Sequence, residues 1–206
     1  MACGVHSHCV LRFPFVVVLA ISFSSSLACT ANVSTEEDGV SEEELAKAPM
    51  ANFKKVRSGL YRGGHPDAAG IAYLKKIGVK TIVDLEIGDF IEATPWSISD
   101  ELDAASAAGI TVLRYPMSAF EPALSRRFDD AMSSILAVLA DKSRAPIYVH
   151  CKHGQDRTGL VVGLERVELE GWTPAKAHAE MVTIGFHTAF VGLEEYFENR
   201  TGWENR

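Results

Sequence analysis

Beyond residue 49, apolar positions alternate between short runs and longer periodic segments. The short runs are rich in β-branched and aromatic residues, which is typical of buried strands, and they occupy residues 60–62, 81–85, 110–115 and 146–149. The periodic segments repeat apolar residues every three or four positions, as one face of a helix does; the clearest contains Phe128, Ala131, Met132, Ile135, Leu136 and Leu139. The pattern therefore predicts strands that alternate with helices.

Capping residues and glycines locate the other helices. Proline, serine or threonine favours a helix start, and glycine favours a helix end. The expected helices cover residues 66–77, 99–108 and 159–170, and a last one starts at Thr173 and Pro174. Strands separated by helices favour an α/β fold, with a central, mostly parallel twisted sheet of four to five strands flanked by helices. Ligands of such sheets bind at the carboxyl ends of the strands, so the turn after Val149 is the first place to look for function.

The first 28 residues have the layout of a secretory signal peptide. A short start without acidic residues precedes an apolar run over residues 13–23, which is shorter than the about 20 residues of a transmembrane helix. Residues 26–29, Ser-Leu-Ala-Cys, resemble a bacterial lipobox with Ser in place of the usual Leu. We expect an exported protein, periplasmic or an outer-membrane lipoprotein if bacterial, whose membrane contact is a lipid on Cys29 or none. The alternatives are a buried helix or an uncleaved anchor.

Residues 29–48 are expected to be an acidic, disordered linker, and residues 49–206 to be one domain. Six acidic residues stand against one lysine between residues 30 and 48, with little that could pack. The whole chain of 206 residues has a net charge of −7, which argues against a nucleic-acid partner because such partners need a basic excess.

Export would leave one cysteine in the folded domain. The four cysteines stand at positions 3, 9, 29 and 151, a spacing that fits no disulfide framework and no zinc pattern. Cys151 would then have no disulfide partner, so it is either an inert buried thiol or a reactive one.

The turn around Cys151 offers the groups that bind an anion. Gly154 permits a tight turn, and the helix that follows points its free N–H groups back at the turn. Successive N–H groups and the helix dipole attract negative charge, and Arg157 adds a fork of donors that matches phosphate oxygens. We expect these groups to hold the Cys151 sulfur as a thiolate and to bind a phosphate with the same donors.

The motif His150-Cys151, five residues, Arg157-Thr158-Gly159 resembles the active-site signature of the cysteine-dependent protein tyrosine phosphatase superfamily. Residues 60–66 and 74–85 look like the atypical dual-specificity phosphatases, including their plant and fungal branch. The outline is also similar to the tyrosine-phosphatase-like phytases of exported bacterial proteins. The resemblance covers residues 56–185 and implies a dual-specificity phosphatase-like fold.

The resemblance also implies roles for the signature residues. Cys151 would be the nucleophile and form a phosphocysteine, and Thr158 would hydrogen-bond its sulfur and help it leave. His150 would order the loop. The phosphate oxygens would be held by Arg157 and by the backbone N–H groups of the loop, Lys152, His153, Gly154, Gln155 and Asp156. No metal or other cofactor is implied, and the spacing of His150, Cys151 and His153 matches no common metal site.

The general acid is the one role that the signature does not assign. The superfamily uses an Asp on an upstream loop to protonate the leaving oxygen. Glu121 lies between a predicted strand and a predicted helix, 30 residues before the cysteine, and is the preferred candidate. Glu86 and Asp89 are lesser candidates, while Asp129 and Asp130 lie off the apolar face of their helix and are expected to be solvated.

The expected substrates are phosphorylated proteins, at tyrosine, serine or threonine, or inositol polyphosphates. Lys152 and His153 make the loop basic, and four further cations are expected near it: Lys54, Lys55, Arg57 and Arg62. A basic surround would suit a polyanion, whereas the negative charge of Asp156 argues against one.

Two other functions fit parts of the pattern. A non-catalytic phosphate-binding module would explain the missing Asp. A rhodanese-like sulfurtransferase would also hold a lone cysteine between a strand and a helix, although Arg157-Thr158-Gly159 argues against it.

Overall fold

The computed structural model describes residues 39–88, 96–119 and 126–204. The chain divides into two units, Met1–Thr35 and Glu36–Arg206, and all described residues belong to the second. The predicted signal peptide, Cys29 and residues 29–38 of the predicted linker therefore lie outside the described residues. Among the residues that the structure does describe, no helix is long and apolar enough to cross a membrane.

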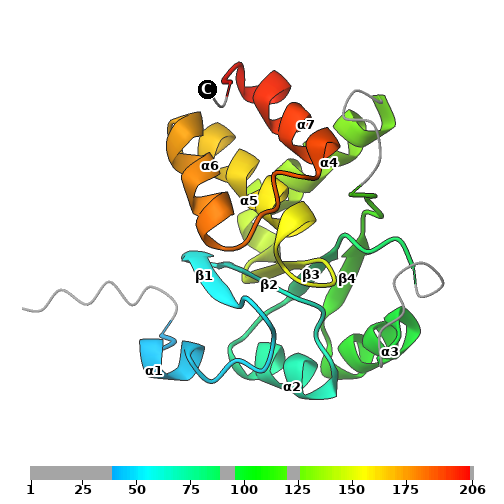
Figure 1. Ribbon diagram of the computed structural model, residues 1–206. Helices are drawn as coiled ribbons and strands as arrows, with labels where there is room; N and C mark the ends of the chain where they lie inside the picture. The colour runs from blue at the N-terminus through cyan, green and yellow to red at the C-terminus, as the bar shows by residue number, and fades with distance from the viewer. Residues whose placement is uncertain (1–38, 89–95, 120–125, 205–206) are drawn as a thin grey trace, which may run out of the picture. The chain divides into compact units, whose positions relative to one another are not determined.

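A five-stranded sheet forms the centre of the second unit (Figure 1). Its strands are β1 (Lys54–Arg57), β2 (Leu60–Gly63), β3 (Thr81–Asp84), β4 (Thr111–Arg114) and β5 (Ile147–His150). The spatial order is β1-β2-β5-β3-β4, with β1 antiparallel to β2 and the other neighbours parallel. The predicted mostly parallel sheet of four to five strands is confirmed. The edge strand β1 was not predicted, because its polar sequence Lys-Lys-Val-Arg has no apolar run.

Helices cover both faces of the sheet. In Figure 1, α2 (Ala68–Lys76) and α3 (Ile98–Ala108) lie on one side of the sheet, and the remaining long helices lie on the other. That second group is α4 (Arg126–Ala140), α5 (Asp156–Glu168), α6 (Pro174–Thr183) and α7 (Val191–Thr201). Two short elements are α1 (Glu42–Leu45) and the 3₁₀ turn η1 (Lys142–Arg144).

The capping signals locate α2, α3, α5 and α6, but only the start of α6 is predicted correctly. Thr173 caps α6 by accepting a hydrogen bond from Lys176 N, as predicted. Two predicted starts are shifted: α2 is capped by Asp67 rather than begun by Pro66, and the side chain of Ser97, not Ser99, caps α3. The helix predicted from residue 159 begins at Asp156, because the turn after Cys151 passes directly into α5.

Two apolar cores pack against the two faces of the sheet. Along β5, Ile147 and Val149 lie in the core beneath α4 and α5, whereas Tyr148 lies in the core with α2. Successive side chains of a strand point to opposite faces. Cys151 continues the first set, and His150 continues the second. Two residues that are neighbours in sequence therefore lie on opposite sides of the sheet.

The last part of the predicted linker is folded, contrary to the prediction. Leu45 of α1 is buried in the core with Tyr73, whose hydroxyl donates to the backbone oxygen of Glu44 at 2.8 Å. Lys76 pairs with the Glu44 carboxylate at 2.8 Å. One leucine in an acidic segment is too weak a signal to predict this docking, because the partners lie about 30 residues away on α2.

Candidate active site

Cys151 lies at the carboxyl end of β5, between that strand and the start of α5, where the sequence placed the site. Its loop is tightly folded at Gly154, which has a φ of +71°. A Cβ at this position would collide with the backbone of Gly63. Gly154 is therefore required both by its left-handed conformation and by the close approach of the β2 end.

Three successive carbonyl groups of the loop are held from outside. The bonds are His65 N to Lys152 O at 3.2 Å, Asn52 Nδ2 to His153 O at 2.8 Å, and Arg62 Nη2 to Gly154 O at 2.7 Å. The C=O and N–H of one trans peptide point in opposite directions. The N–H groups of residues 153–155 therefore point away from these anchors, toward the inside of the loop. This is the arrangement of donors that binds an anion.

Arg157 is fixed at the first turn of α5 and is only 5% exposed. Its Nη1 donates to Leu85 O and to Met117 O, each at 3.3 Å. These carbonyls follow β3 and β4, so the guanidinium spans the carboxyl ends of the neighbouring parallel strands. The sequence predicted a phosphate-binding arginine here, and its two backbone anchors hold the group rigidly beside the loop.

Cys151 is 2% exposed and is the free cysteine of the described chain. Thr158, whose hydroxyl was expected to hydrogen-bond the cysteine sulfur, is fully buried. Within residues 39–88, 96–119 and 126–204, its Oγ1 has no hydrogen-bond partner. The expected bond to the sulfur is therefore not formed in this structure.

Arg62 lies beneath the loop, on the same face of the sheet as Cys151. It is 1% exposed, and two of its nitrogens, Nε and Nη1, have no hydrogen-bond partner in the described parts of the chain. Burial lowers the pKa of Arg62 to about 10, against the opposing effect of the nearby Cys151, so the guanidinium stays charged at neutral pH. The prediction that Arg62 is close to the loop is confirmed, but the side chain supports the loop from below rather than facing solvent.

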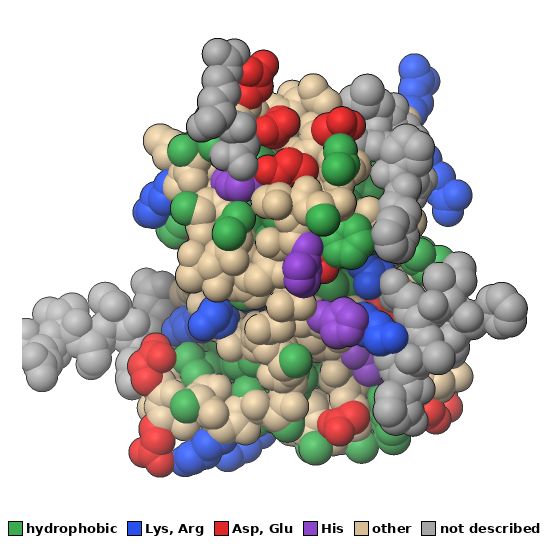
Figure 2. Space-filling view, in the orientation of Figure 1, with side chains coloured by type: hydrophobic (Ala, Val, Ile, Leu, Met, Phe, Trp, Pro, Cys, Tyr) green, Lys and Arg blue, Asp and Glu red, His purple; other side chains and the backbone are tan. Residues whose placement is uncertain are grey.

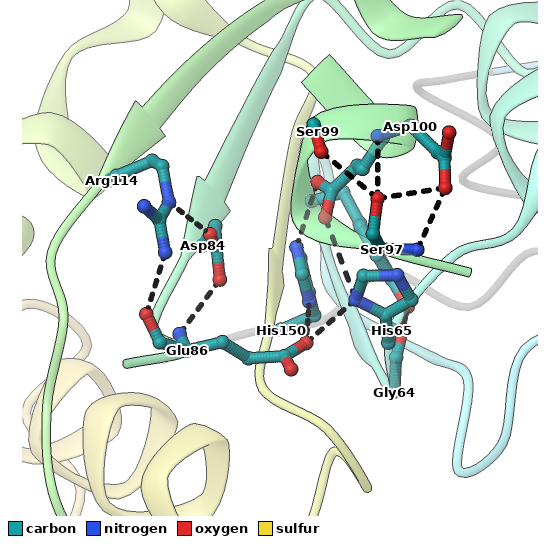
Figure 3. A network of polar contacts seen from close by, with 11 residues as sticks. Gly64, His65, Asp84, Glu86, Ser97, Ser99, Asp100, Arg114 and His150 are labelled. Carbon is teal, nitrogen blue, oxygen red and sulfur yellow. Dashed lines mark hydrogen bonds and ion pairs between the residues drawn. The ribbon is translucent and has the colours of Figure 1, made fainter. Parts of the chain in front are cut away.

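On the opposite face, His150 belongs to a buried polar network (Figure 3). Its Nε2 is 3.1 Å from Glu101 Oε1, and its Nδ1 is 3.6 Å from Glu86 Oε1. His65 Nδ1 is 2.7 Å from the same Glu86 oxygen. Burial would lower the pKa of His150, but the nearby carboxylates of Glu101 and Glu86 raise it well above its usual value.

Glu86 is unsuited to be the general acid, contrary to its candidacy. Burial alone would raise the pKa of Glu86, but the neighbouring His150 and the bond to His65 outweigh burial and hold it well below the usual range. The carboxylate is therefore ionised at neutral pH and has no proton to give. His65, Glu86 and His150 also place potential metal-ligand atoms within 4.8 Å of one another.

The other acid candidates fall into two groups. Glu121 and Asp89 lie outside the described residues. Asp129 is exposed, as predicted, and it also joins α4 to α7 by accepting hydrogen bonds from Tyr196 Oη at 2.7 Å and Arg200 Nη1 at 2.6 Å. Asp130 is exposed, in agreement with its prediction.

Four cations were expected near the loop, and for Arg57 this prediction is wrong. Arg57 is the last residue of β1 and pairs with Leu60 at the start of β2, at the opposite end of the sheet, and its Nε pairs with Glu165 at 2.6 Å. Lys54 and Lys55 line a shallow pocket beside α1 together with Phe53. The basic surround of the loop is therefore smaller than the sequence suggested.

The Asp156 carboxylate is bound by a neighbouring residue, His187. Asp156 Oδ1 accepts from His187 N at 2.8 Å and lies 3.0 Å from His187 Nδ1. Both His187 and the loop residue His153 are exposed. Figure 2 shows histidine side chains close together near the middle of one face, beside basic side chains.

Three residues that support the loop were not identified from the sequence: Asn52, His65 and Glu101. A signal for His65 was available, since it follows the end of β2 and the carboxyl ends of parallel strands meet at one edge. Asn52 and Glu101 carried no comparable signal, because their partners are 101 and 49 residues away in the chain.

A cysteine after a parallel strand, a loop whose carbonyl groups are held from outside and an arginine in the next helix form an arrangement that is typical of tyrosine phosphatases. The chain belongs to the tyrosine phosphatase family, whose model matches residues 47–200.

Two curated relatives illustrate the range of this family. The chain is 32% identical over 140 residues to the dual specificity protein phosphatase TpbA of Pseudomonas aeruginosa, covering 67% of this chain and 56% of the relative. It is 30% identical over 150 residues to the inositol diphosphatase DSP4 of Arabidopsis thaliana, covering 73% of this chain and 72% of the relative. The chain thus spans little more than half the length of the bacterial relative.

Solved structures show the same fold. The crystal structure of P. aeruginosa TpbA has a TM-score of 0.58 at 25% identity, covering 72% of this chain and 84% of that one. The core catalytic domain of the PP-IP phosphatase SIW14 from S. cerevisiae has a TM-score of 0.59 at 23% identity, covering 73% and 85%.

Proposed function

We propose that this protein is a cysteine-dependent phosphatase that cleaves phosphomonoesters through a phosphocysteine intermediate. The observation that supports this most is the outward anchoring of the carbonyls of Lys152, His153 and Gly154, which turns the following N–H groups inward beside Cys151. Family membership supports the same chemistry.

The reaction would proceed in two steps. In the first, the Cys151 sulfur attacks phosphorus, a P–S bond forms, and the P–O bond to the leaving group breaks. A general acid, for which we propose Glu121, protonates the leaving oxygen. In the second, water attacks phosphorus, the P–S bond breaks, and inorganic phosphate leaves as the thiolate is restored. Arg157 and the inward N–H groups hold the phosphoryl oxygens in both steps.

Thr158 would act in the second step. Its buried hydroxyl has no partner among the residues described, so it has a donor to offer to the sulfur as negative charge returns there. We infer that the bond forms during the reaction, since apo geometries of catalytic hydrogen bonds often tighten only in the complex.

We propose phosphotyrosine proteins or inositol polyphosphates, including pyrophosphorylated ones, as the substrate class. TpbA has been crystallised in complex with phosphotyrosine, and the plant relative is named an inositol diphosphatase. Asp156, whose charge would disfavour a polyanion, is bound by the backbone N–H of His187 and lies beside its ring.

The decisive test compares the wild-type protein with Cys151→Ser on a chromogenic phosphomonoester, a phosphotyrosine peptide and an inositol pyrophosphate. We expect phosphate release by the wild type, loss of more than about 10⁴-fold in the variant, inhibition by vanadate and indifference to chelators. Retained activity in Cys151→Ser would refute the mechanism. Binding of vanadate without turnover by the wild type would indicate a non-catalytic module, and cyanide-dependent thiocyanate formation from thiosulfate would indicate a sulfurtransferase.

We further propose that the protein is exported, with residues 1–28 as its signal peptide and Cys29 as a possible site of lipidation. The support is the apolar run of residues 13–23 followed by small residues and the cysteine. Intact-mass measurement of the mature N-terminus after expression in a bacterium distinguishes the outcomes. An N-terminus at Met1 or Ala2 would refute cleavage, and an unmodified N-terminus near Cys29 would refute lipidation.

A further inference from the structure

Three side chains at the carboxyl end of the sheet bring potential metal ligands together. His65 follows β2, Glu86 follows β3 and His150 ends β5. One ligand atom from each residue lies within 4.8 Å of those of the other two. Figure 3 shows the Glu86 carboxylate turned toward both rings, with its Oε1 at 2.7 Å from His65 Nδ1 and 3.6 Å from His150 Nδ1.

The Nδ1 atom of His150 is a buried nitrogen without a partner. The ring is fully buried, and Nδ1 has no hydrogen-bond partner in the described parts of the chain. On the other side of the ring, Nε2 lies 3.1 Å from Glu101 Oε1, so it is the nitrogen placed to donate its N–H to a carboxylate. The second carboxylate thus fixes the ring with its other nitrogen directed at Glu86. This is how proteins commonly orient a histidine that binds a metal ion.

The two carboxylates give this position a negative charge that favours a cation. Glu86 is 1% exposed and Glu101 is fully buried. In the part of the chain that the structure describes, the ion-pair partners of both carboxylates are histidine rings. The neighbouring Asp84 and Arg114 pair with each other at 2.6 Å and so compensate their own charges. Buried carboxylates are strongly unfavourable unless they are paired or bind a metal ion, and a divalent ion would supply two positive charges.

The distances between these atoms suit a small transition-metal ion. Zn²⁺ holds nitrogen and oxygen ligands at about 2.0–2.2 Å in a tetrahedron, which places neighbouring ligand atoms about 3.4 Å apart. His150 Nδ1 is 3.6 Å from Glu86 Oε1, and His65 Nδ1 is 3.5 Å from Glu101 Oε2, a buried oxygen that has no hydrogen-bond partner among the described residues. The bond of 2.7 Å between His65 Nδ1 and Glu86 Oε1 would open by about 0.7 Å as the metal displaces its proton to solvent.

We propose that His65, Glu86 and His150 bind one transition-metal ion of the Zn²⁺ type, with Glu101 orienting the His150 ring and offering a fourth ligand. Imidazole nitrogens favour such ions over Mg²⁺ and Ca²⁺, which prefer oxygen ligands alone. The ion would join the ends of β2 and β5 to the segment after β3, on the opposite face of the sheet from Cys151. It would therefore stabilise the fold without touching the substrate. Because its ligands are buried, a chelator added during an assay would leave the rate unchanged.

The first test measures the Zn²⁺ that the full chain retains after dialysis, and its Tm with and without Zn²⁺. We expect the wild type to retain one equivalent that Glu86→Gln does not, because the amide lacks the charge of the carboxylate and should bind more than about 100-fold more weakly. Zn²⁺ at about 100 times its Kd should raise the wild-type Tm by about 5 to 10 °C. Glu194→Gln is the matched control, since Glu194 binds His178 at 2.8 Å in a pair between α6 and α7, and it should bind Zn²⁺ like the wild type. Equal retention by the wild type and Glu86→Gln would overturn the proposal.

The second test identifies the ligands by X-ray absorption spectroscopy of the Zn²⁺-loaded wild type. We expect imidazole nitrogens and carboxylate oxygen at about 2.0–2.2 Å and no sulfur at about 2.3 Å. A sulfur ligand would place the ion on a cysteine and overturn the proposal. Cys151→Ser should therefore still bind one equivalent. The exposed His187 is a competing nitrogen ligand, so loss of Zn²⁺ from His187→Gln would also contradict the proposed site.

The wild-type measurements decide the matter even if Glu86→Gln does not fold. A wild type that retains no Zn²⁺ and gains no Tm from it overturns the proposal, because protons on the histidines would then be the only cations of the cluster. None of these measurements depends on activity. An inactive protein that binds Zn²⁺ through nitrogen and oxygen would refute the phosphatase function alone, whereas an active enzyme that binds no Zn²⁺ would refute only the metal site.

Discussion

The two faces of the sheet at the end of β5 carry different sets of charged groups. On the face of Cys151, the polar groups near the loop are two buried guanidinium groups, Arg62 and Arg157, set in an apolar core. On the face of His150, they include the carboxylates of Glu86 and Glu101. The comparison shows how one strand end serves two purposes. Cations gather where a phosphate would bind, and anions gather where the protein anchors the strand.

The largest effect on this comparison should come from Arg157→Lys. Lysine keeps the positive charge but not the planar fork that matches phosphate oxygens, and it cannot reproduce both carbonyl bonds of Arg157. We expect kcat for a chromogenic phosphomonoester to fall by about 10³-fold or more. Arg200→Lys, at an ion pair with Glu168 far from the loop, is the control. A loss smaller than about tenfold would mean that a positive charge alone, without the planar fork of arginine, is enough for catalysis on this face.

An intermediate effect is expected for Arg62→Met. The variant loses the bond to Gly154 O and one buried positive charge, so kcat/KM should fall by about 10- to 100-fold. Two nitrogens of Arg62 have no hydrogen-bond partner in the described structure, so an apolar replacement should change Tm by less than about 4 °C. Thermal denaturation and steady-state kinetics measure both quantities. Full activity, or a collapse of Tm with the activity, would contradict the supporting role assigned to this cation.

The smallest effect should follow Asp156→Asn. The carboxylate is occupied by the backbone and ring of His187, and asparagine can still accept from the backbone N–H. We expect kcat/KM for an inositol polyphosphate to rise by less than about fivefold at low salt and to converge with the wild type at high salt. A rise above about tenfold would show that Asp156 faces the bound substrate and that the cationic character of this face is incomplete.

Much of the fold and part of the site could be predicted because their signals are local. The spacing of apolar residues predicts both the buried strand of residues 81–84 and the apolar face of α4. The loop is equally local: Cys151, Gly154 and Arg157 are separated by fewer residues than two helical turns, so their spacing alone brings them together.

Asn52 and Glu101 could not be predicted as supports of the loop, because each of their contacts joins segments that are far apart in the chain. Arg57 and Arg62 are five residues apart and both basic, yet one lies at the far end of the sheet and the other beneath the loop. Glu101 resembles any acidic residue in the first turn of a helix, where a solvated carboxylate is usual. Its burial against His150 follows from the packing of α3 on the sheet.

By itself, the sequence determined the alternation of strands and helices, the strand end that carries Cys151, and the short spacing of Cys151, Gly154 and Arg157 in one loop, since these depend on periodicity and on spacing within a few residues. Only the tertiary structure decided which way the loop amides point and which charges face each side of β5. The physical reason is that buried charges and carbonyl anchors need partners in three dimensions. Those partners come from distant segments, which approach each other only when the helices pack on the two faces of the sheet.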